Sequence, residues 1–510
     1  MILLYLFRKG DLMDFKNDRT TDLINILPLL VSFIFLIILF YVYIKYPFLS
    51  VDEGYTRGLL NLNLADMVSV TANDVHPPLY YFINFLFAKL VNFLGLNMDV
   101  MHLVEFPALI PYLILLVFSL TKIRKDYGLL TAGIFSLALI SMSEFFTYYL
   151  TARMYTWTLL FTVIAFFFVK DILEKNDYLS WIMLSIFSIL AAYCHYFSIL
   201  SSIIIYLMLF IWILFYKERE LVKDNLKKFF ASVIACVILF LPWLLVMINQ
   251  MRYVRGHYWI PPVTFDNLVY YVSYGFTISA NQIIQLLSFL AMIAIFIALY
   301  NKFNETRNSE DTFLLMGYGV FVGTILLGFI VSVVYKPILY DRYILHAVGV
   351  LWIAISIKLG DLKLNKSHLL LIIILISVVG AFNVYHEVSE IKDMHQTLLD
   401  ENQLFSGINN NDSIIIYDTD NHYVRTHTEF NKVYKQFSGY KMGNETYKLV
   451  YIGENVTNQT FNIPDDLSKY PDKNIYLLKF YTTEPKFPKN VKAEEIGTGQ
   501  HATIYKLTTV

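Results

Sequence analysis

Two short stretches in the first fifth of the chain combine carboxylates, a histidine and a tyrosine. VDEGYTRG contains Asp52 and Glu53, and DVHPPLYY contains Asp74, His76 and Tyr80. A carboxylate beside an acceptor hydroxyl can act as a general base. The same oxygen and imidazole groups can also hold a divalent cation such as Mg or Mn, although their spacing is not diagnostic of a metal site. The stretches therefore indicate acid–base chemistry, with a cation at Asp52, Glu53, Asp74 and His76 as an alternative.

Arginine, histidine and tyrosine side chains recur later, at the ends of apolar runs. They are Arg153 and Tyr155 in ARMYTW, His195 in CHYF, Arg255 in QMRYVRGHYWIPP, and Arg342 and Tyr343 in DRYIL. Arginine forks match phosphate oxygens in a bidentate manner. Together with the carboxylates, these residues predict a site with an acid–base end and an anion-binding end.

The elements that position these residues must lie in a membrane. Of the 510 residues, 57% are hydrophobic and only 16% are charged, whereas a soluble domain carries about 25% charged residues. The net charge of −1 shows no basic footprint for nucleic acid. The composition predicts a polytopic α-helical membrane protein.

A helix needs about 20 apolar residues to cross a bilayer. Runs of roughly this kind lie at 24–44, 103–120, 128–142, 155–170, 180–195, 197–216, 228–248, 282–300, 313–334, 343–359 and 368–385. They predict about eleven transmembrane helices, preceded by a cytoplasmic tail at 1–23. A further run at 79–96 is ambiguous, because it could span the membrane or lie at its surface.

Loop charge decides between these two positions, since cytoplasmic loops carry an excess of Lys and Arg. The basic loops are 121–128, 170–177, 216–228, 301–311 and 358–368. With a cytoplasmic N-terminus, all five lie inside only if 79–96 does not span. Tyr81, Asn84 and Asn92 also share one helical face, which suits an interfacial helix. We therefore expect interfacial helices in a first outer loop at 45–102.

The composition becomes polar from about residue 386. Strand-like runs separated by turn-rich segments lie at 413–418, 447–452, 474–481 and 502–509. Alternating β-branched and aromatic residues are typical of strands. Residues 386–510 are therefore predicted to form a small soluble extracytoplasmic domain, either α/β or mostly β.

The VDEGYTRG stretch, followed some twenty residues later by DVHPPLYY, resembles the lipid-phosphate-sugar-dependent glycosyltransferases of the GT-C fold. The nearest likeness is to the protein O-mannosyltransferase and aminoarabinose transferase superfamily. ARMYTW and DRYIL resemble later motifs of its prokaryotic members. The resemblance covers residues 24–385, which we expect to form the transferase domain, and favours a prokaryotic cell membrane over the endoplasmic reticulum.

The resemblance implies inverting transfer of one sugar from a dolichyl or undecaprenyl phosphate to an acceptor hydroxyl outside the cytoplasm. The acceptor could be a glycan, a lipid or a protein. Asp52 would be the general base, with Glu53 beside it. The donor or acceptor would contact Asp74, His76, Tyr80, Arg153, Tyr155 and His195. The lipid phosphate would contact Arg342, Tyr343 and Arg255.

The sequence departs from the motifs of this superfamily at two positions, and three of the residues named also have simpler interpretations. Glu105 replaces an arginine that opens the second span in many relatives, and Thr151 replaces an acid found before the Ala-Arg pair. Asp74 could instead cap a helix, Arg342 could reach toward lipid headgroups, and His195 could be a buried polar group between spans.

Other functions also fit a polytopic membrane protein. A transporter or flippase of lipid-linked saccharides would need ionisable residues at mid-membrane, and the predicted spans have few. A membrane anchor that presents the soluble tail would not need eleven spans. A glycan ligase or polymerase is a closer enzymatic alternative.

Overall fold

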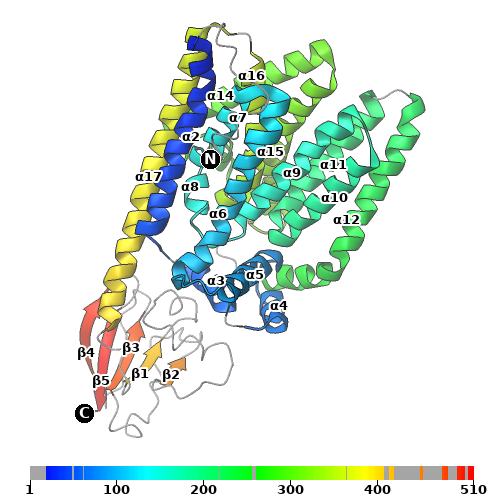
Figure 1. Ribbon diagram of the computed structural model, residues 1–510. Coiled ribbons are helices and arrows are strands. Elements are labelled where there is room, and N and C mark those ends of the chain that lie inside the picture. The colour runs from blue at the N-terminus through cyan, green and yellow to red at the C-terminus, as the bar shows by residue number, and fades with distance from the viewer. Residues whose placement is uncertain are drawn as a thin grey trace.

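The computed structural model describes residues 19–48, 51–60, 62–216, 219–254, 260–362 and 364–406, followed by 413–417, 448–451, 474–479, 491–499 and 503–509. Long helices form a bundle, and a small sheet lies beyond one of its ends (Figure 1). The fold is therefore a helical membrane domain with a C-terminal sheet, as the sequence predicted.

Each predicted span corresponds to one long helix. They are α2 (Arg19–Lys45), α6 (Val100–Phe118), α7 (Arg124–Ser141), α9 (Tyr155–Glu174), α10 (Tyr178–Cys194), α11 (Phe197–Tyr216), α12 (Arg219–Val254), α14 (Gln282–Thr306), α15 (Ser309–Val334), α16 (Leu345–Asp361) and α17 (Lys366–Ser406). Within the described residues, nine continuous stretches are long and apolar enough to cross a membrane. One of these, Val100–Ser141, contains both α6 and α7, and α10 is a shorter apolar helix of 17 residues.

The chain reverses between α6 and α7. After the π-helical turn η1 (Ser119–Ile123), Gly128 has a φ of 86°, a conformation that glycine adopts without steric cost. The Ser119 hydroxyl donates to the carbonyl of Ala132 at 2.8 Å and lies 3.0 Å from the hydroxyl of Ser136. These contacts hold α6 and α7 side by side, so the 42-residue stretch makes two crossings.

Three short helices lie in the first predicted outer loop. They are α3 (Val51–Leu59), α4 (Leu64–Ala72) and α5 (Leu79–Phe93), and they gather at one end of the bundle (Figure 1). Tyr81 and Asn84 of α5 are buried, whereas Leu90 and Phe93 are 51% and 87% exposed. Tyr81 and Asn84 therefore pack on the protein, whereas Asn92 of the same predicted face is exposed. The exposed Leu90 and Phe93 agree with a helix at the bilayer surface.

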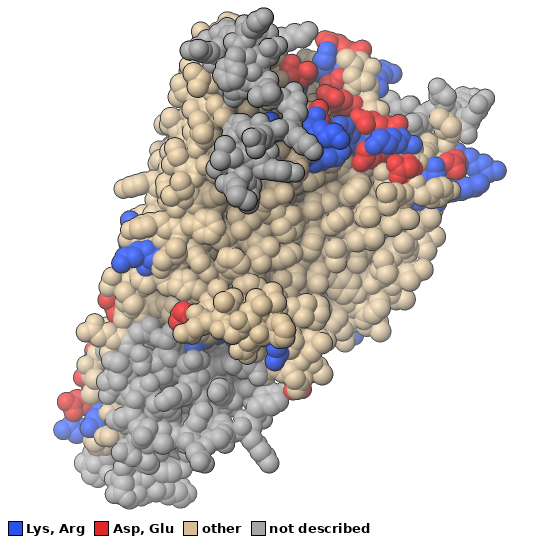
Figure 2. Space-filling view, in the orientation of Figure 1, with Lys and Arg blue, Asp and Glu red and all other residues tan. Residues whose placement is uncertain are grey.

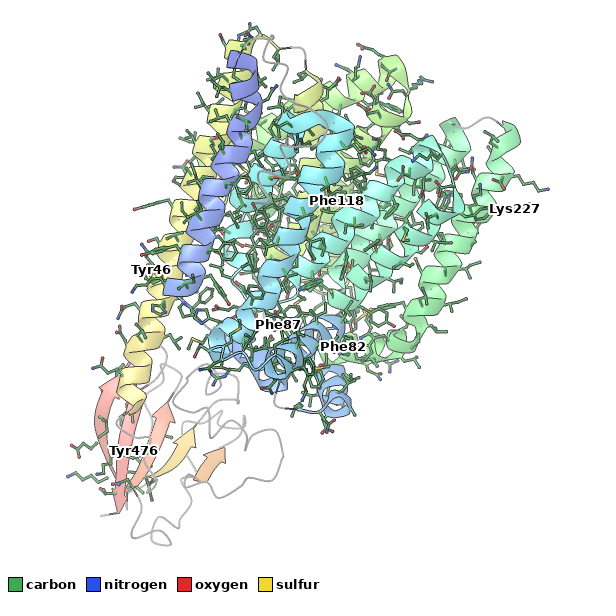
Figure 3. All side chains as sticks on the ribbon, viewed as in Figure 1. Tyr46, Phe82, Phe87, Phe118, Lys227 and Tyr476 are labelled. Atoms are coloured by element: carbon green, nitrogen blue, oxygen red, sulfur yellow. The ribbon has the colours of Figure 1, made fainter. Side chains whose placement is uncertain are left out.

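Four more connections reach the same end as α3–α5. They contain α8 (Phe145–Tyr148), the α10–α11 junction at His195, α13 (Phe265–Ser273) and the 3₁₀ turn η2 (Asp341–Ile344). All five loops predicted to be cytoplasmic lie at the opposite end, where Figure 2 shows a dense group of charged side chains. Figure 3 likewise places Lys227 at the end opposite Phe82 and Phe87.

Aromatic side chains and glycines allow the central helices to pack closely. Phe166 of α9 stacks on Phe313 of α15 with ring centroids 4.6 Å apart, and Trp352 of α16 is 1% exposed. A Cβ atom at Gly349 would lie 2.2 Å from the Leu159 side chain, so α16 approaches α9 this closely only with glycine there. The buried core fixes the helix ends that carry the candidate site.

The C-terminal sheet has five strands in the order β2-β1-β3-β5-β4. The strands are β1 (Ser413–Tyr417), β2 (Lys448–Tyr451), β3 (Asn474–Lys479), β4 (Val491–Thr498) and β5 (Thr503–Thr509). β1 is parallel to β2 and β3, whereas β5 is antiparallel to β3 and β4. The four predicted strand segments match β1, β2, β3 and β5, and β4 is an additional edge strand.

The last helix, α17, has 41 residues and continues twenty residues beyond the composition change at 386. Its extension lies against the start of the first outer loop. The His395 ring nitrogen Nδ1 is 2.6 Å from the carbonyl oxygen of Pro47, and the Lys392 ammonium lies 5.3 Å from the centre of the Tyr46 ring. The helix that leads to the sheet is thus fixed to the segment just before Asp52.

Candidate active site

Asp52 and Arg342 face each other at the end of the bundle that carries α3–α5. Asp52 lies in the first turn of α3, and Arg342 lies in η2, between α15 and α16. The Arg342 Nη2 atom is 3.5 Å from the Asp52 Oδ2 atom, and the two side chains are 22% and 42% exposed. The acid and the arginine that sequence analysis assigned to opposite ends of one site are therefore neighbours, and both remain accessible.

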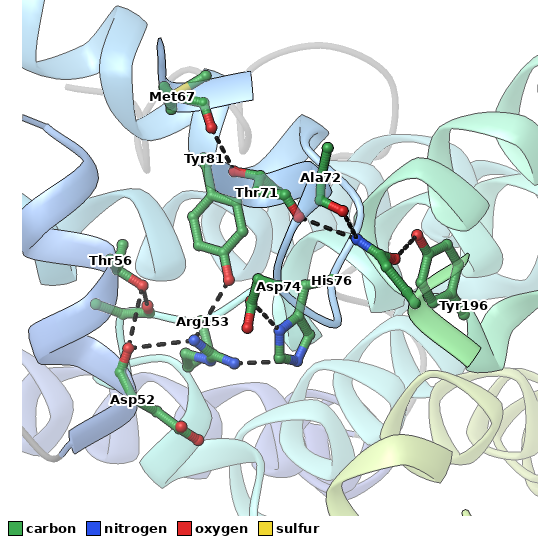
Figure 4. A network of polar contacts seen from close by, with 12 residues as sticks. Asp52, Thr56, Met67, Thr71, Ala72, Asp74, His76, Tyr81, Arg153 and Tyr196 are labelled. Atoms are coloured by element: carbon green, nitrogen blue, oxygen red, sulfur yellow. Dashed lines mark hydrogen bonds and ion pairs between the residues drawn. The ribbon is translucent and has the colours of Figure 1, made fainter. Parts of the chain in front are cut away.

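Arg153 lies at the centre of a buried polar network that includes the backbone of Asp52 (Figure 4). Its Nη1 group donates to the Asp52 carbonyl at 3.2 Å and to the Tyr81 hydroxyl at 3.4 Å. Its Nη2 group lies 3.1 Å from the His76 Nε2 atom. Arg153 thus joins α3, α5 and the α4–α5 loop, and it holds the main chain of Asp52, whose carboxylate faces Arg342.

The hydrogen bonds of His76 determine its tautomer. Arginine can only donate hydrogen bonds, so the His76 Nε2 atom must accept from Arg153. The other ring nitrogen, Nδ1, then carries the hydrogen and donates to the Asp74 carboxylate at 3.0 Å. The three side chains form a directional chain in which Asp74 orients His76 and His76 orients Arg153.

The pKa shifts of this pair agree with that assignment. Burial, together with the charge of Arg153, lowers the pKa of His76, so the imidazole is neutral near pH 7. Burial opposes ionisation of Asp74, but its hydrogen bond with His76 and the charge of Arg153 outweigh burial and lower its pKa. The pair therefore consists of an ionised carboxylate and a neutral imidazole.

Two prolines lie between His76 and the start of α5. Pro77 and Pro78 directly precede α5, whose N-cap residue is Pro78 and makes no side-chain capping bond. Proline suits the start of a helix because the first N–H groups have no partner within it. Asp74 pairs with His76 and does not cap α5, so the capping alternative for Asp74 is wrong.

Aromatic rings from three connections surround Arg342. The His195 ring lies 4.6 Å from the Tyr343 ring and 5.5 Å from the Tyr155 ring, measured between centroids. The Arg342 guanidinium carbon is 5.7 Å from the centre of Tyr155 and 5.8 Å from the centre of Tyr343. Planar guanidinium groups stack favourably on such rings. The aromatic groups lie around the guanidinium that pairs with Asp52.

A cavity of about 340 Å³ opens beside these rings. Its polar lining comes from His76, His195, Tyr196, Gln250, Tyr335, Lys336 and Tyr343. The remaining lining is largely apolar and comes from the ends of α11, α12 and α15. The cavity thus joins the polar site to a membrane-facing apolar wall.

A second chain of hydrogen bonds fixes the end of α4, which leads into the Asp74–His76 loop. Trp243 donates to the Tyr196 hydroxyl at 2.7 Å, and Tyr196 donates to the Gln250 side chain at 2.5 Å. Gln250 in turn donates to the carbonyls of Thr71 and Ala72 at 3.0 and 3.2 Å (Figure 4). Sequence analysis did not identify Gln250, because a single glutamine near the end of an apolar span carries no pattern.

The other residues predicted for the site differ in burial and in contacts. Glu53 is 1% exposed, in contrast to Asp52 beside it. Tyr80 is fully buried, and its ring contacts Tyr81 at 5.7 Å. Tyr81, which was missed as a site residue, is the tyrosine that contacts Arg153. Arg255 lies outside the described residues.

Glu105, one of the two departures noted in the sequence, holds the main chain of the first outer loop. It is 1% exposed in α6, and its Oε1 atom accepts the backbone N–H of Phe48 at 3.0 Å. Phe48 lies four residues before Asp52 in the chain. Glu105 therefore fixes the start of the outer loop, which agrees with a carboxylate acceptor and would not be possible for an arginine donor.

A half-buried carboxylate pair lies behind Arg342. The Tyr274 hydroxyl donates to Glu144 at 3.0 Å, and the Tyr270 hydroxyl donates to Asp341 at 2.8 Å. Burial, with the negative charge of Asp341, raises the pKa of Glu144 to about 7. Glu144 therefore changes charge close to neutral pH within the shell that supports Arg342.

The four residues considered for a divalent cation do not converge. Arg153 lies between Asp52 and the Asp74–His76 pair (Figure 4). Across the part of the chain that the structure describes, no group of three or more His, Cys, Asp or Glu side chains could hold a metal ion. A cation bound with the help of substrate groups stays a prediction from the sequence.

The bundle, the interfacial helices and the acid–arginine site define a structural class: this chain has the GT-C fold. The solved structures it resembles include ArnT from Cupriavidus metallidurans in the apo state, with 11% identity, a TM-score of 0.55, and coverage of 94% of this chain and 97% of that one. ArnT bound to undecaprenyl phosphate gives 11% identity, a TM-score of 0.53, and coverage of 93% and 97%.

A more distant similarity is to the archaeal oligosaccharyltransferase AglB from Archaeoglobus fulgidus, in complex with an inhibitory peptide and a dolichol-phosphate. It has 12% identity, a TM-score of 0.47, and coverage of 85% of this chain and 61% of that one. No protein-family model and no curated protein matches the sequence. The fold predicted from VDEGYTRG and DVHPPLYY is confirmed by the likeness to ArnT over nearly the whole chain.

Proposed function

We propose that this protein is an inverting glycosyltransferase that moves one sugar from a polyprenyl phosphate to an acceptor hydroxyl. The observation that carries the proposal is the accessible Asp52 carboxylate 3.5 Å from the Arg342 guanidinium. The two groups pair in the free site and must separate when a donor binds, so that Asp52 lies beside the nucleophile and Arg342 beside the leaving phosphate with the sugar between them. The GT-C fold supports this assignment by analogy.

In the proposed reaction, Asp52 accepts the proton of the acceptor hydroxyl. The acceptor oxygen forms a bond to the anomeric carbon from the face opposite the phosphate, and the bond from that carbon to the phosphate oxygen breaks. The electron pair leaves with the polyprenyl phosphate, whose charge Arg342 complements. Before substrate binds, Arg342 holds the carboxylate in place, and a bound phosphate would compete for the same guanidinium.

The cavity beside Arg342 is a suitable place for the donor. Lys336 and His195 supply polar groups near the ring of Tyr343, and the apolar wall formed by Leu200, Met247 and neighbouring residues suits isoprene units. ArnT has been solved with undecaprenyl phosphate bound, which favours the same class of ligand here. Dolichyl and undecaprenyl carriers share this chemistry, and the sugar could be a hexose or a pentose.

The site is proposed to lie outside the cytoplasm of a prokaryotic cell. The loops rich in Lys and Arg gather at the other end of the bundle (Figure 2), and such loops remain on the cytoplasmic side. The interfacial face of α5 would place Asp74 and His76 at headgroup depth, where a lipid-borne sugar meets water. The C-terminal sheet lies beyond this end and could help to select a glycan, lipid or protein acceptor.

The test is a transfer assay with the full-length protein in membranes. Wild type, Asp52→Asn and the control Asp66→Asn would receive radiolabelled polyprenyl-phosphate sugars, with native membrane extract as acceptor. Loss of a general base predicts a fall of at least ~100-fold for Asp52→Asn. Asp66 is partly exposed in α4, and its side chain bonds locally to Asn63, so its variant should retain activity. Equal transfer by all three proteins would remove Asp52 from the mechanism.

The same assay separates the remaining alternatives. Transfer of a single labelled sugar supports a transferase, whereas transfer of a whole lipid-linked oligosaccharide identifies a ligase or polymerase. Movement of lipid-linked label between leaflets without transfer would identify a flippase. Repeating the assay with a chelator tests whether a divalent cation assists, and the proposed roles of Asp52 and Arg342 predict activity in its presence.

A further inference from the structure

A second hollow lies among three helices that the proposed reaction does not use. It is a groove of about 700 Å³ lined by residues of α14, α16 and α17. Its walls are apolar and include Leu287, Trp352 and Ile376. Among the residues that line it, Lys358 is the one charged side chain. An apolar groove with one cation differs from the tyrosine- and histidine-lined cavity beside Arg342.

The groove results from a stripe of small residues on α14. Ser288, Ala291, Ala294 and Ala298 all line it, and their spacing of three or four residues places them on one face of a helix. The opposite side of α14 packs against α15, where the Tyr318 hydroxyl donates to the Met292 carbonyl at 3.2 Å. α14 is therefore held by α15 while its small side chains leave space toward α16 and α17.

Lys358 lies at the depth in the membrane at which lipid headgroups are found. It lies three residues before the end of the candidate span Asp341–Asp361. On α14 the lining runs from Leu299 to Ile284, a distance of about 22 Å at 1.5 Å per residue. This is longer than half of a ~30 Å hydrocarbon core. The groove thus runs from the membrane end at Lys358 past the middle of the bilayer.

Lys358 also differs from other lysines at this end of the bundle. It has no ion pair with any residue in the described ranges, whereas Lys302 on α14 pairs with Glu305 at 3.8 Å. A lysine at headgroup depth attracts anionic lipids. Its charge therefore favours a headgroup with a net negative charge over a zwitterionic headgroup at the end of the groove.

We propose that this groove binds an anionic diacyl phospholipid, with its phosphate at Lys358 and an acyl chain against the small residues of α14. The small side chains provide the space, α16 and α17 provide the apolar walls, and Lys358 provides the charge. The site is separate from the Asp52–Arg342 pair and does not depend on the function proposed for that pair.

Native mass spectrometry of the full-length protein in detergent tests the site through lipid retention, not through transfer. Phosphatidylglycerol and phosphatidylcholine would be supplied in turn. Wild type should retain phosphatidylglycerol preferentially, and Lys358→Gln should retain about fivefold less. The control Lys302→Gln removes a lysine at the same end and should retain as much as wild type. Equal retention of the two lipids by wild type would overturn the proposal.

A second variant tests the groove without changing its charge. Ala294→Trp would fill it, whereas Ile297→Trp places the same side chain at a position that is 50% exposed on α14 and does not line the groove. With circular dichroism unchanged, only Ala294→Trp should lose the lipid. Unchanged retention by Ala294→Trp would overturn the proposal. So would a dimer in the wild-type spectrum that disappears in this variant, because a second copy would then be the occupant.

Discussion

The two ends of the helix bundle hold charged side chains in different ways. At the end with the basic loops, most ion pairs join residues three or four positions apart on one helix. Examples are Lys122 with Asp126 at 3.0 Å, Lys175 with Asp171 at 2.8 Å and Lys228 with Asp224 at 2.7 Å. Such pairs require only a helix and stabilise it by a few tenths of a kcal/mol each.

At the end with α3–α5, the polar contacts join residues that are far apart in the sequence. Asp52 pairs with Arg342, and Arg153 bonds to His76 and to the Asp52 carbonyl. These contacts exist only when several connections have been brought together by the whole bundle. The local ion pairs at the end with the basic loops can form in a single helix and add to orientation and solubility. The long-range contacts at the end with α3–α5 form only in the folded bundle, and they therefore mark the candidate site.

The largest difference between the two ends should appear in the rate of sugar transfer by the variants Arg342→Gln and Lys122→Gln. Removing a donor that stabilises a leaving group typically costs about 10²–10³-fold in rate, so Arg342→Gln should lower transfer by this factor. Lys122→Gln removes a local pair at the other end and should leave transfer unchanged. Initial rates with saturating acceptor would measure both. Wild-type rates for Arg342→Gln would show that the arginine only orders the free site.

Arg153→Gln should destabilise the protein much more than a substitution at the opposite end of the bundle. Arg153 is 3% exposed and bonds to three groups, so its loss leaves buried polar atoms without partners. We expect a loss of about 2–4 kcal/mol, measured by thermal unfolding in detergent. The Lys122→Gln protein again serves as the control, since an exposed local pair contributes little. A melting temperature equal to that of wild type for Arg153→Gln would contradict the central role of this side chain.

Glu144→Gln should reveal a pH dependence of stability close to neutral pH. The folded-state pKa of Glu144 is raised from 4.5 to about 7, so the folded protein holds a proton that the unfolded chain releases. Wild-type stability should therefore fall as pH rises from about 4.5 to about 7. The variant lacks this loss and should become more stable than wild type by about 3 kcal/mol at pH 8. A difference that is the same at pH 5 and pH 8 would contradict the shift.

The smallest effect concerns one hydroxyl group. Tyr81→Phe removes an acceptor of Arg153 and should cost about 0.5–1.5 kcal/mol. Tyr112→Phe is its matched control, because the Tyr112 hydroxyl is buried with no hydrogen-bond partner within the described part of the chain. Thermal unfolding should show a loss for the first variant and no loss for the second. Equal melting temperatures would show that the 3.4 Å contact contributes nothing.

The sequence was sufficient for the positions and order of the long helices, because each apolar run is a local signal. Apolar runs gave the spans, and the five basic loops together assigned 79–96 to the membrane surface. The acid of VDEGYTRG and the arginine of DRYIL could be assigned to one side in the same way. Their pairing could not be predicted, because Asp52 and Arg342 are almost 300 residues apart and no periodic pattern connects them.

Two elements show where local patterns fail. β4 is an edge strand that exposes Glu494 and Glu495, and these charges hide its strand character. α17 continues past residue 386 because Val384, Ile391 and Leu398 are buried at seven-residue spacing, a helical stripe that the change in composition obscures. The change in composition marks where the surroundings of α17 become polar, and the helix itself continues.

The unbroken α17 determines how far the sheet can reach. Its 41 residues correspond to about 60 Å of helix, twice a ~30 Å hydrocarbon core. Adding or removing one turn would move the sheet by ~5.4 Å along the helix axis and leave the lining of the Asp52–Arg342 site unaltered. Homologous chains could therefore change the height at which an acceptor is met by changing the length of one helix, independently of the chemistry below it.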